Sequence, residues 1–135
     1  MFTPVFDHYT IKVHDLGRSV AFYKEVLGLS EIENRTQKEH IRWFSLGEGS
    51  ELHIVRGKTD EIVTNIGVHL ALRLQNFDAF LSHLKELQII PHNSKGETGK
   101  ITIRTDGVRQ VYFRDPDGYW IEVNDALGNR NLPRH

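Results

Sequence analysis

The chain has 135 residues, a formal net charge of −1 at pH 7 and no cysteine. This length is enough for one domain with a substantial core, and the near-zero charge gives no electrostatic case for binding nucleic acid or an anionic membrane. The lack of cysteine excludes disulfide bonds and thiolate metal sites, and no apolar run is long enough to cross a membrane. We therefore expect a cytoplasmic protein that binds neither nucleic acid nor a membrane.

The first half of the chain reads as a strand, a helix and three more strands. Residues 5–13 alternate apolar and polar side chains, which predicts the first strand. Asp15 is a suitable helix N-cap residue, the apolar stripe of the helix extends to Leu27, and Gly28 can end the helix with a positive φ. The three strand-like runs that follow lie at residues 29–35, 40–46 and 51–56.

The second half repeats this order after a polar linker at residues 57–65. A strand is expected at 67–74, and Asn76 can cap a helix with Phe77, Leu81, Leu84 and Leu87 on its buried stripe. Pro91 prevents that helix from continuing. The last three strands are expected at residues 101–104, 108–114 and 119–124.

Both halves thus have the order β-α-β-β-β, which is a structural repeat with little sequence identity. We predict an α+β protein of paired βαβββ modules, at about residues 5–57 and 66–125, that form a cupped mixed β-sheet. The modules would make a single domain over residues 1–125, followed by a loose tail at 126–135. A helix covers one face of each predicted sheet, so the opposite face is free to form the cup.

Strand alternation places one potential metal ligand from each of four strands on the cup face. These residues are His8, His53, His69 and Glu122. Imidazole nitrogen and carboxylate oxygen suit a divalent transition metal such as Zn, Ni, Co, Mn or Fe. A single histidine on a strand is more often a structural residue, so the prediction depends on the shared face and the repeat.

Polar and aromatic residues on the same face are expected to line a substrate pocket. They are Thr10, Lys12, Arg73, Trp120 and Asn124. Such a pocket suits an anionic or aromatic small molecule, although simple solvation at the mouth of the cup is an equally good reading of Lys12 and Arg73.

Three segments carry a resemblance to a known family. They read DHYTIKVHDLGRSVAFYKEVLGL, GVHLALRLQN and VYFRDPDGYWIEV, and together they resemble the vicinal-oxygen-chelate superfamily, also known as the glyoxalase/bleomycin resistance/dioxygenase family. The resemblance covers the chain up to about Asn124. It implies the fold of paired βαβββ modules around a divalent metal, with ligands that match His8, His69 and Glu122. His53 stands where glyoxalase I has Glu and methylmalonyl-CoA epimerase, another member of the family, has Gln. The resemblance therefore leaves open whether His53 is a ligand.

The resemblance implies several functions. The first is a metal-dependent lyase or isomerase that acts on a small molecule chelating the metal through neighbouring oxygens, with Glu122 as the catalytic base. Glutathione is not the expected substrate, because Lys12 and Gly57 replace the Arg and Asn that hold it in glyoxalase I.

A second reading uses only His8, His69 and Glu122 as the two-His, one-carboxylate triad of an Fe(II) extradiol-type dioxygenase. The further alternatives are fosfomycin modification and metal-free drug binding of the bleomycin-resistance type. A homodimer is also implied, with modules that pair either within one chain or across a two-fold axis.

Overall fold

The computed structural model describes residues 2–128 and divides into two compact units, with the boundary between Ile62 and Val63. The first unit contains β1 (His8–Val13), α1 (Leu16–Glu25), β2 (Glu31–Ile32), β3 (Ile41–Gly47) and β4 (Ser50–Arg56). Its sheet has the order β1-β4-β3-β2, in which β1 and β4 are parallel and the other neighbours are antiparallel.

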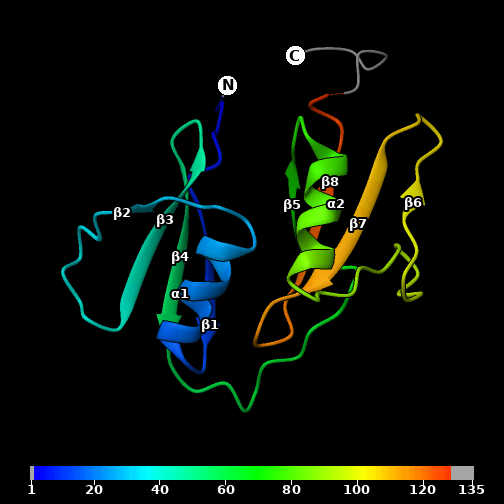
Figure 1. Cartoon of the computed structure of the whole chain (residues 1–135). Helices are drawn as coiled ribbons and strands as arrows, with labels where there is room; N and C mark the ends of the chain where they lie inside the picture. Colours follow the sequence, from blue (N-terminus) through cyan, green and yellow to red (C-terminus); the bar gives the residue numbers. More distant parts are fainter. Residues whose placement is uncertain (1, 129–135) are drawn as a thin grey trace. The chain divides into compact units, whose positions relative to one another are not determined.

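The second unit repeats this arrangement (Figure 1). It contains β5 (His69–Arg73), α2 (Phe77–Glu86), β6 (Thr102–Ile103), β7 (Arg109–Arg114) and β8 (Trp120–Asn124). Its sheet has the order β5-β8-β7-β6, again with one parallel pair, β5 and β8. The predicted α+β class and the two βαβββ repeats are confirmed.

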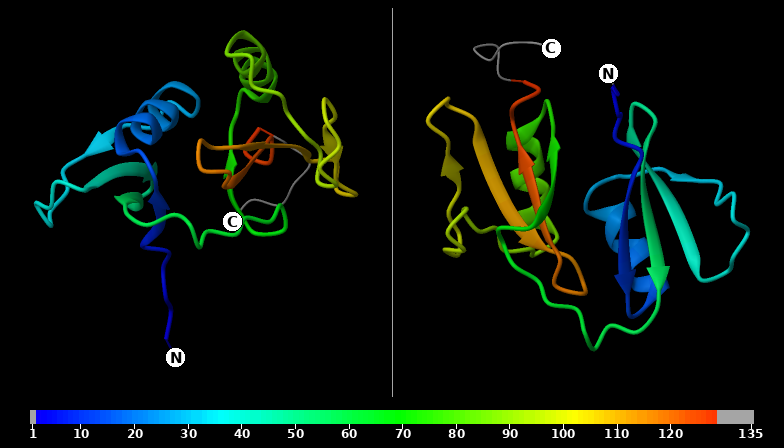
Figure 2. Two further views of the ribbon diagram at one scale, coloured as in Figure 1. Left: turned by 90° about the horizontal axis from the view of Figure 1, so that it is seen from below. Right: turned by 180° about the vertical axis from the view of Figure 1, so that it is seen from behind.

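In the first unit, α1 lies against one face of its own sheet (Figure 2). The Asp15 carboxylate caps the helix by accepting the backbone N–H of Arg18 at 3.0 Å, as predicted, and Gly28 follows with φ 65°. Val20 and Tyr23 of the helix are buried together with Phe44 and other apolar residues of β3 and β4. These strands direct every second side chain into that core, so the intervening residues occupy the other face of the sheet.

Two details of α2 differ from the prediction. Asn76 makes no side-chain capping hydrogen bond, and the buried stripe consists of Phe77, Phe80 and Leu84. Phe80 takes the place expected for Leu81 because its ring packs on Phe113 of β7, with 5.8 Å between the ring centroids.

Several strands are shorter than predicted, and β1, β2, β5 and β6 are each shorter by two or more residues. β1 begins at His8 rather than at residue 5, because its ladder with β4 starts where His8 pairs with Glu51, and the chain before Ser50 belongs to the turn between β3 and β4. β2 is limited to two residues because the side chain of Asn34 donates hydrogen bonds to the carbonyls of Lys38 and Ile41 and closes the following loop on itself.

The predicted tail lies mostly outside the described residues, which end with a turn at Gly128. Over the described part of the chain, no helix combines the length and apolarity that a membrane crossing requires.

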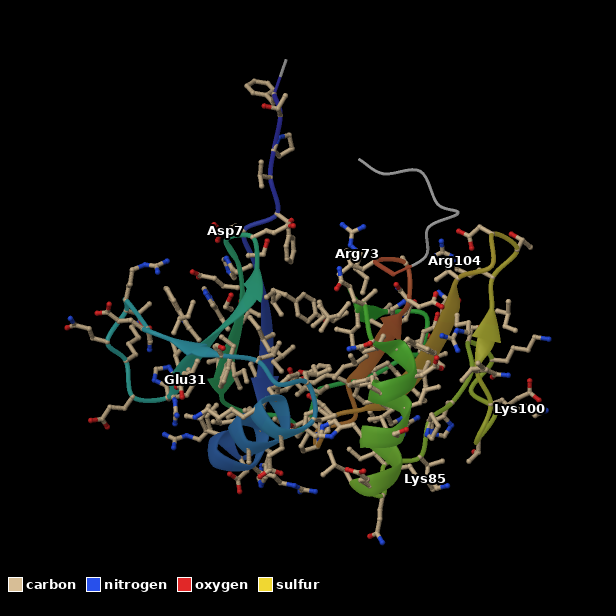
Figure 3. The ribbon with its side chains drawn as sticks, turned by 45° about the horizontal axis from the view of Figure 1, so that its top comes forward. Asp7, Glu31, Arg73, Lys85, Lys100 and Arg104 are labelled. Atoms are coloured by element: carbon tan, nitrogen blue, oxygen red, sulfur yellow. The ribbon has the colours of Figure 1, made fainter. Side chains whose placement is uncertain are left out.

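Glu31, labelled in Figure 3, connects β2 to two neighbouring elements. Its carboxylate accepts hydrogen bonds from Arg42 of β3, one of them at 2.7 Å from Nη2, and lies 3.1 Å from Lys24 Nζ of α1. Mainly through the Arg42 hydrogen bonds, the pKa of Glu31 falls from its ordinary value of 4.5 to about 2.

We predict that acid removes the contribution of Glu31 to stability. A carboxylate with a lowered pKa stabilises the fold fully above its unfolded pKa and loses that contribution as the pH falls through the folded pKa. The difference in unfolding free energy between wild type and Glu31→Gln should be constant near neutral pH, shrink below pH 4.5 and disappear only below about pH 2. Urea denaturation over a pH series measures this difference. Glu33→Gln, an exposed neighbour, is the control, and a Glu31→Gln difference that is independent of pH would contradict the prediction.

Candidate metal centre

The register of the parallel pair in the second unit brings His69 and Glu122 together. Ala71 on β5 pairs with Glu122 on β8, and His69 lies two residues before Ala71 on the same face. The His69 Nε2 atom is 3.1 Å from Glu122 Oε1, and the other ring nitrogen, Nδ1, is 2.7 Å from the carbonyl oxygen of Ile66. The two predicted ligands of this unit are therefore in direct contact.

The hydrogen bond to Ile66 decides which nitrogen of His69 carries a proton. A carbonyl oxygen can only accept, so Nδ1 is the donor and Nε2 of the neutral ring presents a lone pair to the Glu122 carboxylate. Two acceptors at this distance require a positive species, either a proton on Nε2 or a cation that contacts both atoms. Two ligand atoms about 2.1 Å from one ion and roughly 95° apart lie about 3.1 Å from each other, so this pair fits a transition metal.

The Glu122 carboxylate is buried and accepts several hydrogen bonds. Tyr112 donates its hydroxyl to Oε1 at 2.9 Å, and Asn124 donates Nδ2 to Oε2 at 2.6 Å. Burial raises the pKa of Glu122 and is the largest single influence, but the hydrogen bonds from Asn124, Tyr112 and Gln110, with the nearby His69, outweigh it. The net effect is a pKa below the ordinary value, so Glu122 is held as a carboxylate anion, which is the form that ligates a metal.

The first unit contains an equivalent pair in the same register. Thr10 on β1 pairs with His53 on β4, which places His8 diagonally beside His53. The two imidazole rings are stacked, with 4.2 Å between centroids and 16° between planes. The His53 ring also stacks on the ring of Trp43 of β3, with 3.9 Å between the centroids and 6° between the planes.

The stacked geometry bears on which nitrogens can bind a metal. Imidazole lone pairs lie in the plane of the ring, so two nearly parallel rings do not aim at one ion. His8 Nδ1 is 2.5 Å from Asp7 Oδ2, so Nε2 is the candidate ligating atom of His8. His53 Nε2 is 2.9 Å from Glu51 Oε1, and this hydrogen bond, ahead of the other influences, lowers the pKa of Glu51.

Between residues 2 and 128, no three His, Asp or Glu side chains gather within reach of one metal position. The structure instead places the four predicted ligands as two pairs, one in each unit. The His69–Glu122 pair fits a metal by distance and by donor chemistry, whereas the His8–His53 pair is a ring stack.

The predicted pocket residues divide into two groups. Thr10, Lys12 and Arg73 are exposed, and Arg73 lies at the carboxyl end of β5 (Figure 3). Trp120 is buried beneath the guanidinium of Arg114, which lies 4.5 Å from the ring, and Asn124 is buried against Glu122.

Sequence reasoning missed the residues that support the ligands. Tyr112 and Gln110 contact Glu122, and Glu51 and Trp43 contact His53. Alternation within residues 108–114 was the available signal, because the apolar Val111 and Phe113 leave Gln110 and Tyr112 on the cup face. What alternation could not supply was the register that places Tyr112 directly opposite Glu122.

Comparison with known proteins identifies the family. The sequence profile of the Glyoxalase/Bleomycin resistance protein/Dioxygenase superfamily matches residues 5–123. The chain belongs to this superfamily. Its relatives include the uncharacterized protein YwbC of Bacillus subtilis, 30% identical over 122 residues that cover 86% of this chain and 93% of YwbC.

A second relative of this chain is a Vibrio parahaemolyticus protein named probable lactoylglutathione lyase. It is 26% identical over 124 residues, which cover 86% of each chain. Among solved structures, oxidase ChaP-H2 matches with a TM-score of 0.76 and 23% identity over 92% of this chain and 94% of that one. At this level of identity the structural match is a likeness of fold. It agrees with the fold predicted from the sequence.

We predict that Tyr112→Phe raises the pKa of Glu122. The substitution removes one hydroxyl donor from Oε1 and keeps the ring, so the carboxylate anion loses part of its stabilisation. Carboxyl-carbon NMR of the metal-free protein over a pH series measures the shift. Tyr9→Phe is the matched control in β1, and an unchanged titration of Glu122 in Tyr112→Phe would show that the hydrogen bond is absent in solution.

Proposed function

We propose that this protein is a metal-dependent enzyme in which His8, His69 and Glu122 hold one divalent transition metal. The observation that carries the proposal is the His69–Glu122 pair, in which ring nitrogen Nε2 faces a carboxylate oxygen at a distance that suits a shared cation. Membership of a superfamily whose members typically use divalent metals supports it. The substrate is a small molecule that chelates the metal through neighbouring oxygens, and Lys12 and Arg73 are proposed to face an anionic group on it.

His53 has a supporting role in this proposal. Its ring is stacked between His8 and Trp43, and Glu51 holds its Nε2 atom. We propose that the stack fixes the orientation of His8 and that the metal is bound by three protein ligands. The alternative is that His53 is a fourth metal ligand, which requires its ring to leave the stack with His8 and Trp43.

The environment of Glu122 favours the oxygenase reading over the isomerase reading. Moving a proton between adjacent carbons needs a base with a pKa near the working pH. Glu122 has a lowered pKa, and both of its oxygens already accept hydrogen bonds. When bound, Fe(II) would polarise the substrate oxygens and supply electrons to O₂, which is chemistry that needs no carboxylate base. The His8, His69 and Glu122 set matches the ligand type of such enzymes.

A lyase or isomerase is the second candidate function. The relatives named as lactoylglutathione lyases favour it, and they include the Vibrio parahaemolyticus protein. For this function, Glu122 must lose its hydrogen bonds before it can act as the catalytic base. Otherwise a second carboxylate must act as the base in its place.

The metal content tests the ligand set. We expect about one transition metal per chain in the wild type, retention of the metal in His53→Ala and loss of it in Glu122→Ala. Elemental mass spectrometry of the untagged protein after reconstitution measures this, with Glu33→Ala as a surface control. Loss of the metal in His53→Ala would establish four ligands. A metal-free wild type would contradict both enzyme functions and favour a binding protein.

Loading with different metals tests the reaction. With Fe(II), we expect consumption of O₂ in the presence of a catechol, measured with an oxygen electrode, and no consumption in Glu122→Ala. With Ni, Zn or Co, we expect no exchange of the carbon-bound proton of an α-hydroxy ketone for deuterium, measured by NMR in D₂O. Deuterium exchange without O₂ consumption would reverse the order of the two candidates.

A further inference from the structure

The two oxygens of Glu122 have different partners. Oε1 faces His69 Nε2 at 3.1 Å and also accepts the Tyr112 hydroxyl. Oε2 accepts Asn124 Nδ2 at 2.6 Å, the shortest of these contacts. Sequence alternation assigned Asn124 to a substrate pocket, whereas its amide is directed at the metal-ligand candidate.

The orientation of the Asn124 amide is fixed by a second hydrogen bond. Its Oδ1 atom accepts the backbone N–H of Ala126 at 3.1 Å, and a backbone N–H can only donate. The amide nitrogen must therefore be the group that faces Glu122, which removes the usual ambiguity between the two ends of an asparagine side chain. Asn124 and Glu122 are both buried and lie two residues apart on β8, so they share one face of the strand.

We infer that Asn124 is a positioning residue that makes Glu122 ligate the metal through Oε1 alone. The inference rests on the proposed function, because it assumes that Glu122 is a ligand. The Asn124 amide competes with a metal for Oε2, whereas Oε1 is the oxygen that lies beside His69 Nε2.

A single ligating oxygen has a consequence for the substrate. Three protein ligand atoms leave three positions open on an octahedral ion, and a chelating carboxylate would leave two. The proposed substrate takes two positions with its neighbouring oxygens. Asn124 would thus preserve the third position for a second reactant, as the oxygenase reading requires.

The test is Co(II) binding to the metal-free, full-length protein. Asn124→Leu keeps the volume but removes the donor, and Asn124→Ala is the second variant in case one of them does not fold. Asn76→Ala is the control, because the Asn76 side chain makes no capping hydrogen bond. Competition with a coloured chelator gives the affinity, the visible absorption of bound Co(II) reports its coordination number, and circular dichroism on heating confirms folding.

We expect Asn124→Leu and Asn124→Ala to bind Co(II) about 10- to 100-fold more weakly than the wild type, as for other residues that orient metal ligands. We also expect a changed visible spectrum for each bound ion, because a released Oε2 can chelate and take one of the positions that Asn124 keeps open. Equal affinity and an equal spectrum in a folded variant would overturn the inference and leave the proposed function standing. A wild type that binds no Co(II) would overturn both.

Discussion

The contact between His69 Nε2 and Glu122 Oε1 is the interaction on which the functional reading of this protein depends. Its meaning comes from a neighbouring hydrogen bond, since the Ile66 carbonyl accepts the Nδ1–H of the ring and Nε2 of the neutral ring then directs a lone pair at the carboxylate. The hydrogen bonds from three donors outweigh the effect of burial and keep Glu122 ionised, so the carboxylate retains a negative charge that a cation can balance. Two hydrogen-bond acceptors, His69 Nε2 and Glu122 Oε1, therefore face each other on the sheet. This arrangement lowers the stability of the fold unless a proton or a metal ion lies between them.

The two units use one geometrical plan with different chemistry. Each has a parallel strand pair that sets a histidine diagonally beside the next candidate ligand, and each places an aromatic residue opposite that ligand on the adjacent strand. In the second unit the aromatic residue is Tyr112, which donates a hydrogen bond to a carboxylate. In the first unit it is Trp43, whose ring stacks on His53. The same register therefore yields a polar ligand pair in one unit and an aromatic stack in the other.

The residues that hydrogen-bond the candidate ligands distinguish the candidate reactions more clearly than the candidate ligands themselves do. A fold hosts several chemistries, so the types of the candidate ligands do not by themselves select one reaction. A carboxylate that is held ionised by Tyr112, Asn124 and Gln110 is well suited to bind a metal and poorly suited to accept a proton from carbon. This distinction depends on side chains that have no special spacing in the sequence.

The sequence by itself determined the α+β repeat, the capping of α1 by Asp15 and the face of the sheet on which each candidate ligand lies. These features follow from local rules, because alternation and capping involve residues close together in the chain. Only the tertiary structure decided the partners of each ligand. The buried stripe of α2, the length of β2 and the contacts of Glu122 with Tyr112 and Asn124 depend on strand register and on packing between distant segments. Register joins residues that the sequence separates, so alternation can say which way a side chain points but not which atom it meets.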